Sequence, residues 1–281
     1  MNGVIEIPLF RLLIAYAFVG VTILVSSLFK LSRDKEIIVA TLRMTVQLLI
    51  VGYILNYIFA IQSVLLAVGM ICVMEGFAVD NAIRRARVAM RNRLKLVAGT
   101  VLVVGTFAAL LIFLFLVLGL KGFNARYVIT ICGMLLGNAM TGLSIAIRAL
   151  VGGFARDRAQ IESALMLGAS PFQASSGLIR EAFTLSAMPN VNSMMGMGIV
   201  SLPGMMTGQI LSGMSPLVAT KYQIAILLGQ SGTITLCCAA FLMLGYKTFF
   251  NQRAQLLDVE VLKKSSAGIH FPWTNGRLGK Q

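Results

Sequence analysis

The sequence has few charged side chains and few of the residues from which metal and catalytic sites are usually built. Only 12% of its 281 residues are charged, whereas a soluble domain typically has about a quarter. It has one histidine, His270, and four cysteines, all within apolar runs and none in a C-x-x-C pair. These absences argue against a soluble domain, a zinc site and a disulfide framework.

The sequence also lacks the loop G-x-x-x-x-G-K-[ST] that cradles a nucleotide phosphate, so we do not expect the chain itself to bind ATP. Its N-terminus has Glu6 in place of the basic segment of a signal peptide. By contrast, hydrophobic residues make up 58% of the chain. Together with the scarcity of charge, this content predicts an integral membrane protein.

Seven apolar segments are each long enough to cross a bilayer, which takes roughly 20 apolar residues. Because lipid offers the backbone no hydrogen-bond partners, we expect each segment to be a helix. The predicted fold class is an all-α, polytopic membrane helix bundle, with residues 1–250 as the transmembrane domain and 251–281 as a tail. The seven segments are about 8–29, 37–59, 63–79, 96–120, 127–150, 187–211 and 222–250.

The net charge of +14 comes from Lys and Arg residues that gather on one side of these segments. The opposite side has Lys121, Arg126 and Lys221, with Arg11 near the outer end of the first segment. The positive-inside rule then places the N-terminus outside the membrane and the C-terminus in the cytoplasm. Basic loops of this kind favour membrane lipid, and no nucleic acid, as their partner.

Two charged residues lie inside the predicted spans. Arg43 is about two turns into the second span, and Glu75 lies near the expected cytoplasmic end of the third. The two spans are joined by a very short loop and should run antiparallel, which would bring the two side chains to a similar depth. They can form an ion pair, or each can reach independently for the headgroups.

The fifth span contains small and polar residues. Gly133, Gly137 and Thr141 follow small-xxx-small spacing, which allows two helices to approach closely. Asn138, Thr141 and Ser144 add polar atoms along the same segment. These residues predict a helix that is buried in protein, where they line a pathway or form a packing interface.

The segment 152–184 is too polar to span the membrane and too long to be a simple connector. Residues 161, 164, 165 and 168 fall at helical spacing and make one apolar face. Gly168 can end that helix, and Ser170 can cap a second one, with Pro171 in its first position and Gln173 completing a capping box. We therefore predict a cytoplasmic helix-turn-helix hairpin, which receives a soluble partner or only stabilises the bundle.

The sixth span is interrupted by the sequence SLPGMMTGQ, residues 201–209. Pro203 removes an amide donor and clashes with the preceding turn, so the helix should kink or break near Ser201. Nearby methionines can offer soft thioether ligands or simply fill an irregular interface. The residues that we assign to this hinge or pathway segment are Ser201, Pro203, Gly204, Met205, Met206, Thr207 and Gln209.

Several blocks of the sequence resemble one known family. Glu162, Ala164 and Gly168 are similar to the core of the E-A-A-x-x-x-G loop of ABC-transporter permeases, although Ser163 replaces its second residue. The blocks RMTVQLLIVGYIL, GNAMTG, LGASPFQA and SLPGMMTGQIL occur in order between Arg43 and residue 223. Together they resemble the FetB/YbbM-type permease family, which is associated with bacterial iron export and related to plant aluminium-tolerance half-transporters.

The resemblance implies a permease subunit of the bacterial inner membrane that exports iron or another metal ion. A separate FetA-like ATPase subunit would use ATP and Mg, two permeases would pair as a homodimer, and this chain would bind no cofactor. Glu162, Ala164 and Gly168 would contact the ATPase, with Arg156 and Arg158 adding charged contacts. The residues that ligate metal are unknown, and the alternatives are an ATPase-independent secondary transporter or channel, or a scaffold without transport.

Overall fold

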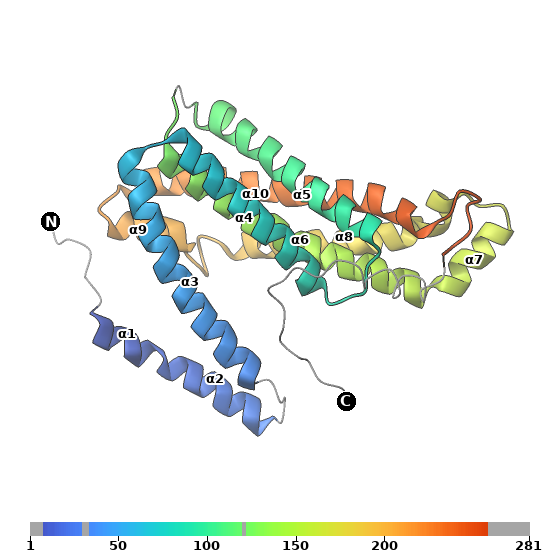
Figure 1. The fold of residues 1–281 in the computed structure, drawn as a ribbon, viewed down its shortest axis with the longest axis horizontal. Coiled ribbons are helices and arrows are strands. Elements are labelled where there is room, and N and C mark those ends of the chain that lie inside the picture. The colour runs from blue at the N-terminus through green and yellow to red at the C-terminus, as the bar shows by residue number, and fades with distance from the viewer. Residues whose placement is uncertain (1–7, 30–33, 120–121, 258–281) are drawn as a thin grey trace.

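The structure is a computed structural model that describes residues 8–29, 34–119 and 122–257, and in this part of the chain every regular element is helical (Figure 1). The helices are α1 (Leu9–Ala15), α2 (Ala17–Leu28), α3 (Asp34–Ile61), α4 (Val64–Ala86), α5 (Asn92–Ile112), α6 (Ala125–Arg156), α7 (Arg158–Met166), α8 (Pro171–Gly196), α9 (Gly204–Leu211) and α10 (Pro216–Gly245). A π-helical turn, Phe113–Val117, extends α5, and a 3₁₀ turn, Tyr246–Phe249, extends α10. The predicted all-α class is confirmed.

Among the described residues, six helical segments are long and apolar enough to cross a membrane, rather than the seven that we expected. They are Phe10–Leu28, Asp34–Ile61, Val64–Ala86, Asn92–Val117, Ala125–Arg156 and Pro216–Phe249. The expected span at 187–211 is instead divided between α8 and α9. Because α7 and α9 lie at opposite ends of the bundle, α8, the interruption and α9 together still run along its length (Figure 1).

Helix α6 is the centre of the bundle and packs against α4, α5, α8 and α10. Small residues permit this close packing. A Cβ atom added at Gly142 would lie 2.9 Å from Ile234 Cγ2 on α10 and 3.6 Å from the backbone oxygen of Ser186 on α8. One added at Gly153 would lie 2.7 Å from Leu178 Cδ1 on α8. Glycines therefore let α6 touch two neighbouring helices at once.

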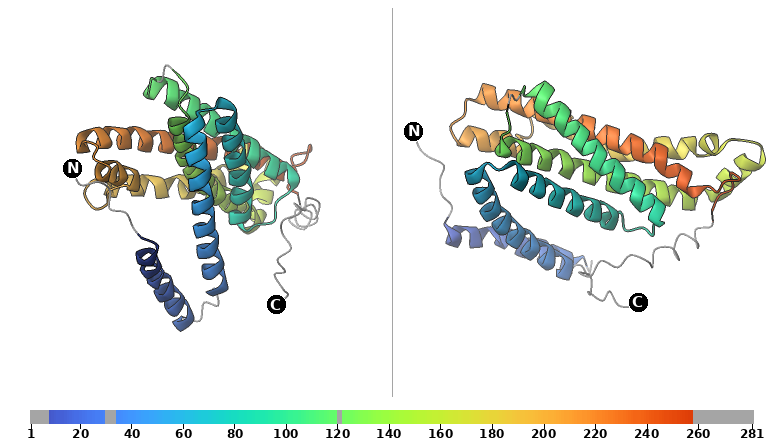
Figure 2. Two further views of the ribbon diagram at one scale, coloured as in Figure 1. Left: turned by 60° about the vertical axis from the view of Figure 1, so that its left-hand side comes forward. Right: turned by 45° about the horizontal axis from the view of Figure 1, so that its top comes forward.

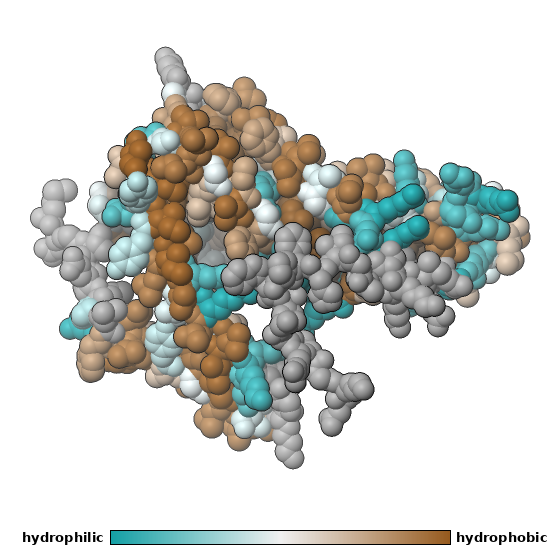
Figure 3. Space-filling model, in the orientation of Figure 1, coloured by the Kyte–Doolittle hydropathy of each residue, from teal (hydrophilic) through white to brown (hydrophobic). Residues whose placement is uncertain are grey.

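Helices α1 to α3 form an arm at the edge of the molecule (Figure 2). Within the arm, Tyr16 Oη lies 2.5 Å from Thr45 Oγ1. The arm meets the bundle near the α3–α4 loop, where Ile58 packs with Ala67 and Ile129, and at the other end of α3 through a 3.5 Å ion pair between Arg87 and Glu36. Apolar side chains cover much of the outer surface of α3 (Figure 3).

The predicted hairpin is present, but its second helix is much longer than expected. Ser170 accepts a hydrogen bond from the backbone of Gln173 and Pro171 opens α8, so the predicted capping box is confirmed. Gly168 lies in the turn with φ +91°, a backbone conformation that favours glycine. Helix α8 then continues to Gly196 instead of ending near residue 184. The hairpin is thus continuous with the bundle and is not a separate element lying on its surface.

Candidate functional site

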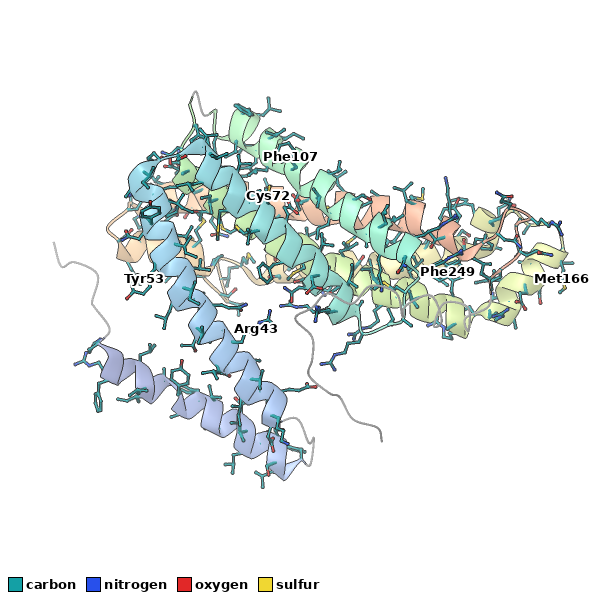
Figure 4. The ribbon with its side chains drawn as sticks, in the orientation of Figure 1. Arg43, Tyr53, Cys72, Phe107, Met166 and Phe249 are labelled. Carbon is teal, nitrogen blue, oxygen red and sulfur yellow. The ribbon has the colours of Figure 1, made fainter. Side chains whose placement is uncertain are left out.

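The short helix α7 lies at one extreme end of the molecule and carries an apolar tip (Figure 4). Ile161 is buried and anchors α7 to the rest of the protein. Met166 and Leu167 point the other way, with 87% and 90% of their surface exposed. Neighbouring exposed apolar side chains on a projecting turn can mark a surface that contacts another protein or the membrane. We call Met166 and Leu167 the hairpin tip.

Charged residues at the base of the hairpin are engaged with one another. Arg158 Nε lies 2.9 Å from Glu162 Oε1 within α7. Arg156 contacts both Asp157 and Glu181, each at 2.8 Å, and so joins α6 to α8. The hydrogen bond from Arg156 lowers the pKa of Asp157, because it stabilises the carboxylate. Only the Arg156–Glu181 pair joins two helices, and three predicted docking residues, Arg156, Arg158 and Glu162, take part in these pairs.

The other two predicted docking residues have different surroundings. Ala164 is half-buried on α7, and Gly168 is exposed in the turn directly after the hairpin tip. No atom lies within 4 Å of a Cβ added at Gly168, so its backbone conformation, and not crowding, is what requires glycine there. The structure thus brings all five predicted residues into one hairpin, where their role in ATPase docking stays a prediction.

The predicted break in the sixth span is a seven-residue interruption, residues 197–203, and not a single kink. Gly198 has φ +88°, its N–H donates to the oxygen of Ser201, and the Ser201 N–H donates to the oxygen of Gly196. The side chains of Ile199 and Val200 are 95% and 85% exposed. Irregular backbone within a membrane must be covered by protein or water, so this segment marks a face that lipid alone does not cover.

Helix α9 holds most of the remaining hinge residues. Pro203 precedes its first residue, Gly204, and its oxygen accepts hydrogen bonds from both the backbone N–H and Oγ1 of Thr207. Met205 packs against the cluster that contains Ile226 of α10. The contact is with apolar side chains, which favours the packing interpretation for this methionine.

Two glutamines have polar atoms that the described part of the chain leaves without a partner. Gln209 Oε1 on α9 and Gln223 Oε1 on α10 are buried and accept no hydrogen bond. Gln209 was assigned to the pathway from its sequence, while Gln223 was not. Met206, also assigned to the pathway, is half-buried on α9.

The small and polar residues of α6 divide into two groups. Gly133 is a packing position, because a Cβ there would lie 2.9 Å from Met74 Cε on α4. Asn138 and Thr141 are exposed and bond only to the oxygens of Met134 and Gly137 in their own helix. A Cβ at Gly137 would meet no atom within 4 Å. One part of α6 therefore packs within the chain, and the other is an uncovered polar face.

Arg43 and Glu75 do not form the ion pair that we considered. Glu75 lies in the middle of α4, not near its end, and its Oε1 is 2.5 Å from Thr106 Oγ1 on α5. Arg43 is exposed on α3 (Figure 4). Helices α3 and α4 spread apart from the short loop that joins them (Figure 1), and this divergence separates the two side chains.

No cluster of three His, Cys, Asp or Glu side chains that could hold a metal ion occurs within the described residues. Cys132, Cys237 and Cys238 are buried and free, and Cys72 is exposed and free. Within the same residues, the broken span offers backbone oxygens, amides, hydroxyls and thioethers, and no preformed charged cage.

Some structurally important residues were not evident from sequence. Arg148 on α6 donates from Nε to the oxygen of Ala86, at 3.2 Å, and from Nη2 to the oxygen of Arg85, at 2.9 Å, so it caps the C-terminus of α4. The periodicity of the sequence could have placed Arg148 on a helix, but no neighbouring residue indicates that it bonds to the end of α4. The hairpin tip did have a sequence signal, two large apolar residues directly before a turn glycine.

The chain was compared with known proteins. The profile described as "Uncharacterised protein family (UPF0014)" matches residues 9–250. The chain is 35% identical, over 90% of its length and 96% of the relative's, to "Probable iron export permease protein FetB" of Escherichia coli (strain K12). It is 34% identical to "Protein ALUMINUM SENSITIVE 3" of Arabidopsis thaliana, over 80% of this chain and 81% of that protein. The comparison with solved structures gave no match.

Proposed function

Because this chain belongs to the UPF0014 family, we propose that it is the permease subunit of an ABC transporter that exports iron or another metal ion. The family and the six apolar helices identify it as an integral membrane protein of the bacterial inner membrane. One relative is named as a probable iron export permease, which supports a transporter and not an enzyme. The ATPase partner, the cargo and the direction of transport are parts of the proposal.

The observation that carries the proposal is the hairpin tip. Met166 and Leu167 project from the end of α7, which buried Ile161 anchors to the rest of the protein, beside an ion pair that joins α6 to α8. An apolar pair on a rigid, projecting support suits a pocket on a soluble protein, and in an ABC transporter that protein is the ATPase. In this assignment ATP and Mg are bound by the partner, the hairpin lies in the cytoplasm and the N-terminus lies outside.

The uncovered faces of α3 and α6 support a homodimer of permeases. Arg43 is exposed within an apolar helix, and a central arginine in lipid costs roughly 2.5–3.5 kcal/mol on insertion scales. Asn138 and Thr141 are exposed on α6. A second copy of the chain, together with a wet pathway between the copies, would cover all three residues. Two permeases would then bind two ATPases.

The proposed function is tested by measuring metal export in cells that lack their own exporter. We expect the chain, expressed with its ATPase, to lower cell content of one among iron, manganese, copper and zinc. An ATPase with its phosphate-binding lysine replaced should abolish the effect. Export that persists with the inactive ATPase would contradict the ABC assignment. Unchanged content of all four metals would contradict metal export.

A secondary transporter or channel is the second candidate, and the break between α8 and α9 favours it, because such proteins often place interrupted helices around their sites. The ATPase-inactive experiment separates the two candidates, since a secondary transporter or channel would continue to move its solute. The hairpin tip has no use in that alternative, and for this reason we prefer the ABC permease.

A further inference from the structure

One buried carboxyl group has no part in the proposed docking or pathway. Glu75 lies at the middle of α4 and is 8% exposed. Its Oε1 atom contacts Thr106 Oγ1 on α5, while its Oε2 atom is buried and has no hydrogen-bond partner. No Lys or Arg forms an ion pair with it within the described residues. An ionisable side chain in this position inside a membrane bundle is a candidate functional site.

The contacts of Thr106 indicate which protonation state fits. Thr106 Oγ1 lies 2.5 Å from Glu75 Oε1 and 2.7 Å from the backbone oxygen of Leu102. A hydroxyl has one hydrogen to donate, and it commonly donates to the carbonyl four residues earlier in a helix. If Thr106 donates to Leu102, the hydrogen in the short contact between the two side chains must come from Glu75.

A neutral Glu75 satisfies this arrangement, and an ionised one does not. The carboxylic acid O–H donates to Thr106, whose own O–H donates to Leu102, which leaves only a neutral carbonyl oxygen without a partner. An ionised Glu75 would instead bury a negative charge, half of it on an atom that receives no hydrogen bond. An isolated buried carboxylate is so unfavourable that the group takes up a proton instead.

The surroundings of Glu75 favour a proton over a metal ion as its ligand. In the described part of the chain, the titratable side chains near enough to feel a charge on Glu75 include Cys132 on α6 and Cys237 on α10. Both thiols are buried, and Cys237 Sγ lies 2.5 Å from the position of a Cβ added at Gly105, so it packs tightly against α5. Glu75 and these two cysteines are not gathered into a metal site, since no group of three acidic, thiol or imidazole side chains that could hold a metal ion occurs among the described residues.

We propose that Glu75 is a proton-binding site, a neutral carboxylic acid that joins α4 to α5 and releases its proton to water when the two helices separate. The step is a simple ionisation: the acid O–H bond breaks, its electron pair stays on the carboxylate, and water accepts the proton. The contact between α4 and α5 is thereby sensitive to pH, whatever energy source drives the protein. This inference is independent of the ABC assignment.

Infrared spectroscopy of the purified full-length chain tests the protonation state directly. We expect the wild type at pH 7 to show the carbonyl stretch of a protonated carboxylic acid, and ¹³C-labelling of glutamate carboxyl groups to move that band. Glu75→Gln should lose the band. Asp80→Asn is the matched control, because Asp80 is on the same helix in an exposed pair with Arg84, and it should keep the band.

A second variant and a second measurement extend the test. Thr106→Val removes the hydroxyl that accepts the hydrogen bond from Glu75, so it should shift the carbonyl band without abolishing it. As pH rises, the folding equilibrium constant of the wild type should fall relative to that of Glu75→Gln, since unfolding releases the proton that the folded state holds on Glu75. The proposal would be overturned if the wild type lacked the band, if glutamate labelling did not move the band, or if the band survived in Glu75→Gln. It would also be overturned if the stability of both proteins depended identically on pH.

Discussion

The hairpin tip allows the docking assignment to be tested without disturbing the fold. The perturbation is the double substitution Met166→Asp with Leu167→Asp. Because these side chains are 87% and 90% exposed, they make few contacts within the chain. The substitution should therefore leave thermal unfolding of the isolated chain unchanged, and any effect on the complex can be assigned to the interface.

The expected magnitude follows from the surface that the two side chains can bury. Fully burying one Leu or Met side chain contributes about 1.5–3 kcal/mol. The pair therefore contributes roughly 3–6 kcal/mol if both enter a pocket on the ATPase, which corresponds to a loss of affinity of roughly 10²- to 10⁴-fold. The burial of two new carboxylates would add to this loss.

The assay is the affinity of the purified chain for its ATPase subunit, together with ATP-dependent metal export. Leu217→Asp is the matched control, because Leu217 is also an exposed apolar residue but lies in the first turn of α10, at the other end of the bundle. An acidic residue is favourable in a first helical turn. Wild-type affinity of the tip variant, or an equal loss in the control, would refute the docking assignment.

Three other predictions concern packing, capping and solvent access. Gly142→Val should destabilise the chain in detergent by roughly 1–3 kcal/mol, because its Cβ would meet both α8 and α10. Gly137→Val, at an open position on the same helix, should leave the unfolding midpoint unchanged. If the Gly142→Val and Gly137→Val variants unfold at the same midpoint, the close packing of α6 at Gly142 is contradicted. Arg148→Gln should cost about 1.5–3 kcal/mol by leaving the end of α4 uncapped, whereas the exposed Arg180→Gln should have no measurable effect on unfolding. The exposed Cys72 is first replaced by Ser. In that background, Ile199→Cys should react with a water-soluble maleimide, whereas Val104→Cys, on the continuous helix α5, should not. Equal reactivity of the two cysteines would rule out a water-exposed face at the break.

Much of the fold could be predicted because the bilayer imposes strong local rules. Long apolar runs such as 127–150 must be helical, and α6 confirms that segment and extends it at both ends. The cap at Ser170 and the turn at Gly168 were also predictable, since both depend on residues within one or two turns. The break near Ser201 followed from Pro203 in the same way, although its length did not.

The parts that could not be predicted depend on contacts between distant segments. The sequence suggested Arg43 as a partner for Glu75, because consecutive spans usually run side by side. The structure instead brings Thr106, 31 residues away, to the same carboxyl group. Likewise, nothing near Arg148 indicates that its guanidinium group caps a helix that ends 62 residues earlier.

The sequence by itself determined the membrane location, the helical class, the hairpin and the position of the broken span. Each of these follows from side-chain chemistry over a short stretch of chain in a known solvent. Only the tertiary structure decided that α6 is central, that the hairpin tip projects while its charged neighbours pair internally, and that Glu75 is buried against α5. These features depend on how helices approach one another, and small residues such as Gly142 set that approach through contacts between segments far apart in the chain.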